Sequence, residues 1–164
     1  MISMPKVLVA VPEKCTGCRI CELACAYHHF KVINPSKSRV RVVRIHHEPA
    51  DAPVFCTQCG LCIGACPFNA LKRDLKTGAV IVDEGKCTGC GVCVQVCPYG
   101  AAVIDRDSRK LLICDLCGGD PECVKHCPEG ALIYVDAEEA AAYKRLLVAK
   151  LHSKPLSPYS PDSR

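Results

Sequence analysis

The sequence predicts an α+β fold with short hairpins, short helices and little other regular structure. Four runs of cysteines alternate with short β-like stretches and turn signals, which fit hairpins better than long strands. The last three runs end in Cys-Pro and continue into small segments typical of a helix end. The apolar share of 49% includes sixteen cysteines, so a conventional core for 164 residues would be thin. Disulfides or bound metal must therefore help to hold the fold together.

The strands are expected close to the cysteine runs. Residues 6–11 (KVLVAV), 79–83 (AVIVD) and 110–113 (KLLI) are β-like, and turn signals lie at 74–78 (DLKTG) and 105–108 (DRDS). The repeating unit is therefore strand, cysteine loop, short helix and strand.

The segment between the first and second cysteine runs is longer than the later intervals and reads as an insertion. Within it, basic and apolar residues alternate, which predicts an edge strand with Arg39 and Arg41 on one face. That face is either a solvated polar face that blunts a sheet edge or a docking face for a partner.

The composition changes after residue 135. Residues 137–152 are predicted to form a helix, with Asp136 as its N-cap and Glu139 at the third helical position. One face of this helix carries the apolar side chains of Tyr143, Leu147 and Leu151. Residues 153–164 are rich in proline and serine, with Pro155, Pro158 and Pro161 at every third position. This tail is either a disordered end or an extended arm on a partner subunit.

The choice between disulfides and metal depends on the cellular compartment. Residues 1–14 contain an apolar run of about six residues, shorter than the core of a signal peptide, and no twin arginine. No window approaches the ~18 apolar residues of a membrane span. We therefore expect a cytoplasmic protein without a membrane span, in which thiols stay reduced and bind metal.

The spacing of the cysteines indicates which metal group they bind. Runs two and three follow C-x2-C-x2-C-x3-C-P, the pattern of bacterial ferredoxins. There, three thiolates hold one [4Fe–4S] cluster and the fourth reaches the other cluster of a pair. Run one has these gaps but Ala26 in place of proline, and run four has a wider middle gap. Zinc motifs use paired cysteines and have no need of a third one, repeated four times. Sixteen cysteines therefore predict four [4Fe–4S] clusters.

The distances between the runs suggest how they pair. Runs two and three begin 31 residues apart, which fits a compact two-cluster unit at about 54–105, with runs one and four paired around it at 5–53 and 106–136. A simpler alternative pairs run one with two and run three with four. The nested arrangement gives four ligand sets: the first outer set (Cys15, Cys18, Cys21, Cys127), the second outer set (Cys25, Cys114, Cys117, Cys123), the first inner set (Cys56, Cys59, Cys62, Cys97) and the second inner set (Cys66, Cys87, Cys90, Cys93).

Charge and motifs argue against several functional classes. The formal charge of +4 becomes −4 if four clusters of net charge −2 are bound, so it does not indicate binding of nucleic acid. An aromatic surface for stacking bases is also missing from the sequence. Every cysteine run is complete and no catalytic arrangement of side chains stands out, so we expect one-electron transfer and no enzymatic activity of the chain by itself. Of the histidines, His28 and His29 after run one and His126 before Cys127 are candidates for tuning a cluster.

The chain resembles the four-cluster ferredoxin-like iron–sulphur subunits of molybdenum or tungsten oxidoreductases, CO dehydrogenases and hydrogenases. The resemblance covers about residues 5–136 and includes the last motif, CDLCGGDPECVKHCPEGAL. The segment CTGCRICELACAYHHFKVINPSKSRVRVVRI resembles a narrower branch that accompanies tungsten aldehyde oxidoreductases, tungsten benzoyl-CoA reductases and CO dehydrogenases. The resemblance supports the nested pairing, residues 1–136 as a four-cluster domain, and a catalytic metal-pterin site in another subunit.

The predicted function is therefore electron transfer between a large catalytic subunit and a second partner. A tungsten or molybdenum aldehyde-oxidising subunit is favoured as the first, and a flavin/NAD subunit or a ferredoxin as the second. The alternatives are a free polyferredoxin, or a subunit of a CO dehydrogenase, formate dehydrogenase, hydrogenase or benzoyl-CoA reductase. Clusters at both ends of the chain would also permit end-to-end self-association.

Overall fold

The computed structural model describes residues 6–45 and 50–153. Helices and strands are both short, so the mixed helix-and-strand character predicted from the sequence is confirmed. Within the described residues the strands form four separate two-stranded antiparallel sheets, which pair β1 with β8, β2 with β3, β4 with β5, and β6 with β7.

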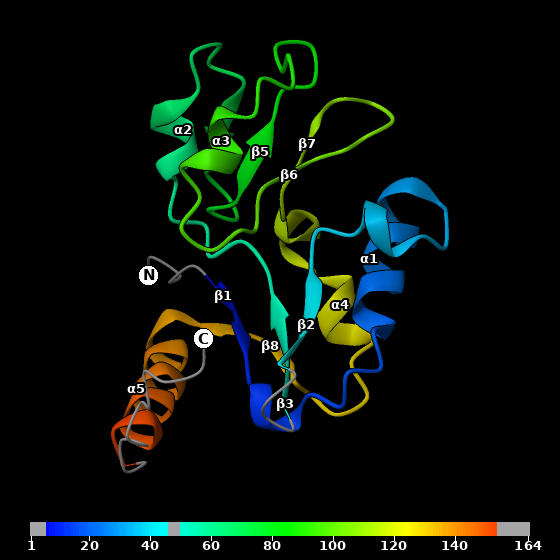
Figure 1. Ribbon diagram of the computed structural model, residues 1–164. Coiled ribbons are helices and arrows are strands. Elements are labelled where there is room, and N and C mark those ends of the chain that lie inside the picture. The colour runs from blue at the N-terminus through cyan, green and yellow to red at the C-terminus, as the bar shows by residue number, and fades with distance from the viewer. Residues whose placement is uncertain (1–5, 46–49, 154–164) are drawn as a thin grey trace, which may run out of the picture.

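The inner half of the molecule is the green upper part of Figure 1. It contains α2 (Leu61–Ala65), α3 (Val92–Gln95) and the hairpin of β4 (Leu71–Arg73) with β5 (Val80–Val82). The turn of this hairpin forms because the Asp74 carboxylate accepts hydrogen bonds from the backbone N–H and the hydroxyl of Thr77, at 3.0 and 2.6 Å.

A second hairpin uses the same turn chemistry. It joins β6 (Val103–Ile104) to β7 (Leu111–Leu112), and its Asp105 carboxylate accepts from the backbone N–H of Ser108 at 3.1 Å. The two turn signals in the sequence therefore mark two real hairpins.

The outer half is closed by strands from the two ends of the described chain. Strand β1 (Lys6–Ala10) pairs with β8 (Leu132–Asp136), and α1 (Ile20–Phe30) packs against α4 (Glu122–Lys125). Blue and yellow segments consequently lie together in Figure 1, below the green inner half. Short 3-10 helices occur at η1 (Pro12–Lys14), η2 (Pro35–Lys37) and η3 (Leu116–Gly119).

The insertion forms a hairpin of β2 (Arg41–Ile45) and β3 (Ala50–Val54). A buried carboxylate fastens it to α1, since Glu22 accepts a hydrogen bond from the backbone N–H of Val42 at 2.6 Å. The expectation that Arg39 shares a solvated strand face with Arg41 is wrong. The chain bends at Arg39 and Val40, next to the buried Ser38, whose hydroxyl donates to the Val40 carbonyl at 2.7 Å. Strand alternation therefore begins only at Arg41, and Arg39 points inward.

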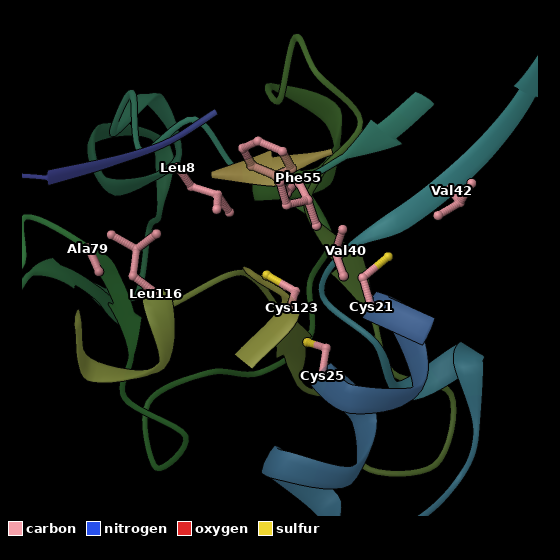
Figure 2. Close-up of a cluster of buried hydrophobic side chains, with 10 residues drawn as sticks. Leu8, Cys21, Cys25, Val40, Val42, Phe55, Ala79, Leu116 and Cys123 are labelled. Carbon is pink, nitrogen blue, oxygen red and sulfur yellow. The ribbon is translucent and has the colours of Figure 1, made fainter. Parts of the chain in front are cut away.

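Two apolar clusters form the core, and cysteines belong to both. In the first, Cys21, Cys25 and Cys123 project among Leu8, Phe55 and other apolar side chains (Figure 2). In the second, cysteines pack with apolar residues of the inner hairpins: Cys56, Cys62, Leu71, Val80, Leu111 and Ile113. The thin core predicted from composition is thus completed by sulphur.

Helix α5 (Ala137–Ser153) follows β8 directly and packs against β1 and β8 near its beginning, where Ala140 is buried. Later in the helix, Lys150 forms an ion pair with Glu13 at 2.7 Å. The prediction for residues 154–164 lies outside the described residues. No helix among the described residues is both long and apolar enough to cross a membrane.

Candidate iron–sulphur cluster sites

Three of the predicted cysteine sets each line a separate cavity. The first outer set surrounds a cavity of about 330 Å³, walled by apolar side chains such as Val42 and Leu132. The second inner set surrounds one of about 340 Å³, next to Leu71 and Leu111. The second outer set surrounds one of about 310 Å³, next to Leu8 and Leu116. These volumes include the open mouths of the cavities.

The first inner set is also brought together. Burial, and then the negative charges of the neighbouring Cys62, Cys59 and Cys97, raise the pKa of the Cys56 thiol to about 11. Cys56 and Cys59 come from the loop before α2, Cys62 lies in α2 itself, and Cys97 follows α3. The two helices contact each other. The structure therefore brings together all four predicted sets.

A left-handed residue before the second cysteine of each run turns the loop so that the thiols converge. Gly17 and Gly89 hold this position in runs one and three, with φ of 71° and 70°. Gln58 and Leu116 hold it in runs two and four, with φ of 61° and 57°. Glycine is therefore absent from this position in two of the four loops, although the residue there also has a positive φ.

Gln58 has a second role, which the sequence analysis missed. Its side-chain Nε2 donates to the carbonyl of Cys114 at 2.7 Å, and its Oε1 accepts from the backbone N–H of Val80 at 2.8 Å. The side chain thus connects the inner hairpin with a predicted ligand of the outer pair. A glutamine in the position of a loop glycine is the signal that could have identified it.

In the three runs that end in Cys-Pro, backbone N–H groups point at the sulphur of the fourth cysteine. Ala70 donates to Cys66 Sγ at 3.4 Å, and Ala131 donates to Cys127 Sγ at 3.2 Å, in each case from four residues further on. Burial would raise the pKa of the Cys97 thiol, but hydrogen bonds from the following backbone N–H groups lower it below its ordinary value. Such N–H···S contacts stabilise a thiolate that binds metal.

In run one, a different segment supplies the backbone N–H group for the fourth cysteine, Cys25. Because proline is absent after Cys25, α1 continues to Phe30, and the residue four positions on, His29, stays in the helix. The N–H group for Cys25 comes from the returning chain instead, where the backbone N–H of Arg39 donates to Cys25 Sγ at 3.3 Å. The insertion therefore replaces the Cys-Pro turn.

Two histidines after or within cysteine runs differ in their surroundings. His29 lies with its Nε2 3.8 Å from Cys117 Sγ and 3.4 Å from a carboxylate oxygen of Asp115. Burial, followed by the charge of Arg39, lowers the pKa of His29 to about 4, so its ring is neutral at pH 7. The expectation for His126 is wrong: it is exposed, and its Nδ1 lies 2.9 Å from the Glu122 carbonyl oxygen, on its own helix turn.

The chemistry of these cavities fits a cluster held by thiolates. Burial raises the pKa of Cys21 and Cys114 to about 12, so without metal these thiols keep their protons at neutral pH. Metal binding must displace those protons, which couples loading of the site to folding. The walls are mainly apolar and each cavity presents four thiols, a soft donor set that suits iron–sulphur clusters better than hard cations, which prefer oxygen ligands.

Comparison with known families agrees with this chemistry. A family model described as a 4Fe-4S dicluster domain matches residues 14–70 and 55–101, and a second model of the same description matches residues 79–128. The chain belongs to the 4Fe-4S dicluster domain family. The chain is therefore an iron–sulphur protein, and the [4Fe–4S] type of cofactor predicted from cysteine spacing is confirmed.

Several curated relatives are similar to this protein over most of the chain. The polyferredoxin-like subunit of aliphatic sulfonate oxidoreductase from Pyrococcus furiosus is 45% identical over 74% of this chain and 71% of its own. The electron transport protein HydN of Escherichia coli is 34% identical over 87% and 96%. The formate dehydrogenase 2 subunit beta of Nitratidesulfovibrio vulgaris is 30% identical over 90% and 84%.

Solved structures include a chain of the active site complex BamBC of benzoyl-CoA reductase with 1,5-dienoyl-CoA. It is 28% identical and is matched over 92% of this chain and 93% of its own, with a TM-score of 0.49.

Proposed function

We propose that the protein is an electron-transfer subunit that holds four [4Fe–4S] clusters, one in each of the two outer and two inner cysteine sets. The observation that carries the proposal is the grouping of sixteen cysteines into four sets of four, three of which line their own cavity. When bound, such clusters supply one-electron transfer. Since each set has four thiols, no iron is left open for a substrate.

The contacts of the outer half support the nested pairing. Pairing of run one with run four needs α1 beside α4 and a link between the first and last strands, and both contacts are present. Pairing of run one with run two requires neither of them. Residues 1–136 then form the four-cluster domain, with the inner unit at about 54–105 and the outer unit at 5–53 and 106–136.

A pair of cysteine changes tests this assignment. Cys18→Ala and Cys127→Ala should each remove or alter one cluster, and the double variant should affect no more than that same cluster. The measurements are iron and sulphide content, about sixteen irons in the wild-type chain, and the electron paramagnetic resonance (EPR) spectrum of the reduced protein. If the double variant loses two clusters, run four pairs with run three and the nested assignment is wrong.

The relatives support a role beside a catalytic subunit, because two of them are named as subunits of oxidoreductases. We propose a large tungsten or molybdenum oxidoreductase subunit as the first partner and a flavin/NAD subunit or a ferredoxin as the second. An aldehyde is the substrate that the sequence resemblance favours. The sulfonate oxidoreductase relative, at 45% identity, makes an aliphatic sulfonate the second candidate.

Co-purification from the native host separates these possibilities. We expect a tagged chain to bring down a large pterin-containing subunit, and the complex to oxidise one of the two substrate classes with transfer of electrons to a dye. The isolated chain should oxidise neither. A chain that purifies as a stable monomer without partners would favour the alternative of a free electron carrier. Relatives named as electron transport proteins support this alternative.

A further inference from the structure

A charged network lies in the wall of the cavity that the second outer set surrounds. Besides the four thiols, the cavity is lined by His29, Arg39 and Asp115. The guanidinium Nη1 of Arg39 lies 2.6 Å from a carboxylate oxygen of Asp115, and the Arg39 side chain is only 17% exposed. A partly buried ion pair therefore borders a site whose other lining groups, apart from His29, are apolar side chains and thiols.

One donor of this network has no acceptor in the protein. The Nε of Arg39 is buried without a hydrogen-bond partner, and among the described residues it is the one buried side-chain nitrogen or oxygen atom in that state. A buried N–H without an acceptor is costly, and native structures almost always satisfy such groups. Because Arg39 lines the thiol cavity, a sulphur of a group bound there would be an acceptor for this donor.

We propose that Arg39 is a positioning residue for the cluster of the second outer set, that it donates its Nε–H to a sulphur of this site, and that its charge raises the reduction potential of this cluster. The inference rests on the proposed ligation of that cluster. The insertion would thus give run one a side-chain donor, which the other three runs do not have. There, backbone N–H groups alone point at the fourth sulphur, whereas Arg39 offers both its backbone N–H, to Cys25 Sγ, and its side chain.

The sign of the effect follows from the charges next to the site. Reduction adds a negative charge, so a nearby cation favours the reduced state and a nearby anion disfavours it. The Arg39 guanidinium and the Asp115 carboxylate lie 2.6 Å apart and both line the cavity, so one cation and one anion border the site.

Two single changes should therefore shift the potential in opposite directions. Arg39→Gln leaves the Asp115 carboxylate uncompensated and should lower the midpoint potential of one cluster. Asp115→Asn leaves the Arg39 cation uncompensated and should raise it. The double variant should lie between the two. The measurement is a redox titration of the full chain at about pH 8, where carboxylates are ionised, followed by EPR.

The matched control is Arg41→Gln, which removes the same charge two residues further on. The Arg41 guanidinium donates to the Ser36 carbonyl and does not line the cavity.

The hydrogen bond is tested directly by isotope labelling. Arginine labelled with ¹⁵N only in the guanidinium group should give a hyperfine coupling to one reduced cluster of the wild-type chain, and Arg39→Lys should abolish it. Labelling the guanidinium alone excludes the backbone N–H of Arg39, which also contacts a sulphur.

The outcomes separate this inference from the proposed function. Unchanged potentials in both single variants, or no coupling to labelled arginine, would overturn the role of Arg39 while leaving four clusters in place. A wild-type chain without the second outer cluster would overturn the ligation itself. If Arg39→Gln loses the cluster, Asp115→Asn and the labelled wild-type chain still decide, because both keep the guanidinium.

Discussion

At the scale of single residues, the cluster loops depend on backbone conformations that few side chains accept. Gly89 has a φ of 70°, and a Cβ atom built at this position would collide with the carbonyl oxygen of Arg109. The carbonyl belongs to the backbone beside β7, which carries core residues and has little freedom to move. The CTGC loop of run three is therefore fixed by a close approach between two segments as well as by its own turn.

Replacement of Gly89 by alanine should consequently damage the second inner set. The left-handed conformation alone costs about 1–2 kcal/mol for a residue with a Cβ, and the collision adds to it. We expect iron content to fall by about one cluster and the remaining clusters to be lost at lower temperature. Gly64→Ala is the control, since Gly64 lies in α2 with a negative φ and open space around it. Equal iron contents in the two variants would contradict the argument.

At the scale of elements, the insertion is attached to the inner half by one ion-pair cluster. Lys37 of η2 lies 2.8 Å from the Asp105 carboxylate of the β6–β7 turn and 2.6 Å from Asp107. Asp105 is nearly buried, whereas Asp107 is 79% exposed, so the first contact should matter more than the second. The hydrogen bond from Lys37 is the main reason that the pKa of Asp105 is lowered to about 2.

We therefore expect Asp105→Asn to destabilise the protein by about 1 kcal/mol, which would make the thermal loss of the clusters roughly fivefold faster. Asp107→Asn should have a smaller effect. A carboxyl with a lowered pKa contributes its full stabilisation above its ordinary value of 3.8, and loses it only as the pH falls toward about 2. The ratio of the rates for wild type and Asp105→Asn, followed by visible absorbance, should thus be the same at pH 8 and pH 5, both above that window. A ratio that decreases from pH 8 to pH 5 would show that a group other than Asp105 is responsible for the effect.

At the scale of the whole molecule, the protein has two apolar clusters that serve different pairs of cysteine sets. Leu8 of β1 belongs to the cluster around Cys21, Cys25 and Cys123, and Leu111 of β7 to the cluster around Cys56 and Cys62. Each cluster is small, so each half depends on its own leucines and on its own metal sites.

Leu8→Ala and Leu111→Ala should therefore damage different clusters, at a cost of about 2–5 kcal/mol each. The first should weaken the outer pair of cysteine sets and the second the inner pair, as seen from which EPR signals disappear first on warming. Leu75→Ala, at a position that is 97% exposed, serves as the control. Loss of the same signals in both leucine variants would mean that the halves respond as a single unit.

Sequence alone determined what depends on short stretches of chain. Gaps of two residues let one loop present three thiols, and Asp with Ser or Thr three positions later makes a turn, so the four cysteine loops and both hairpins were predictable. The [4Fe–4S] type of cofactor followed from the same local spacing and does not require the fold.

Tertiary structure decided the features that depend on distant segments. Spacing left two arrangements open for the fourth thiol of each set, and the nested pairing proposed above draws its support from α1 packing against α4 and from β1 pairing with β8. Alternation in the sequence placed Arg39 on one strand face with Arg41, but the bend at Arg39 and Val40 turns it toward Asp115, 76 residues further along the chain. Local patterns describe the direction of a side chain only while the strand stays regular, and an ion pair between distant segments is set by packing.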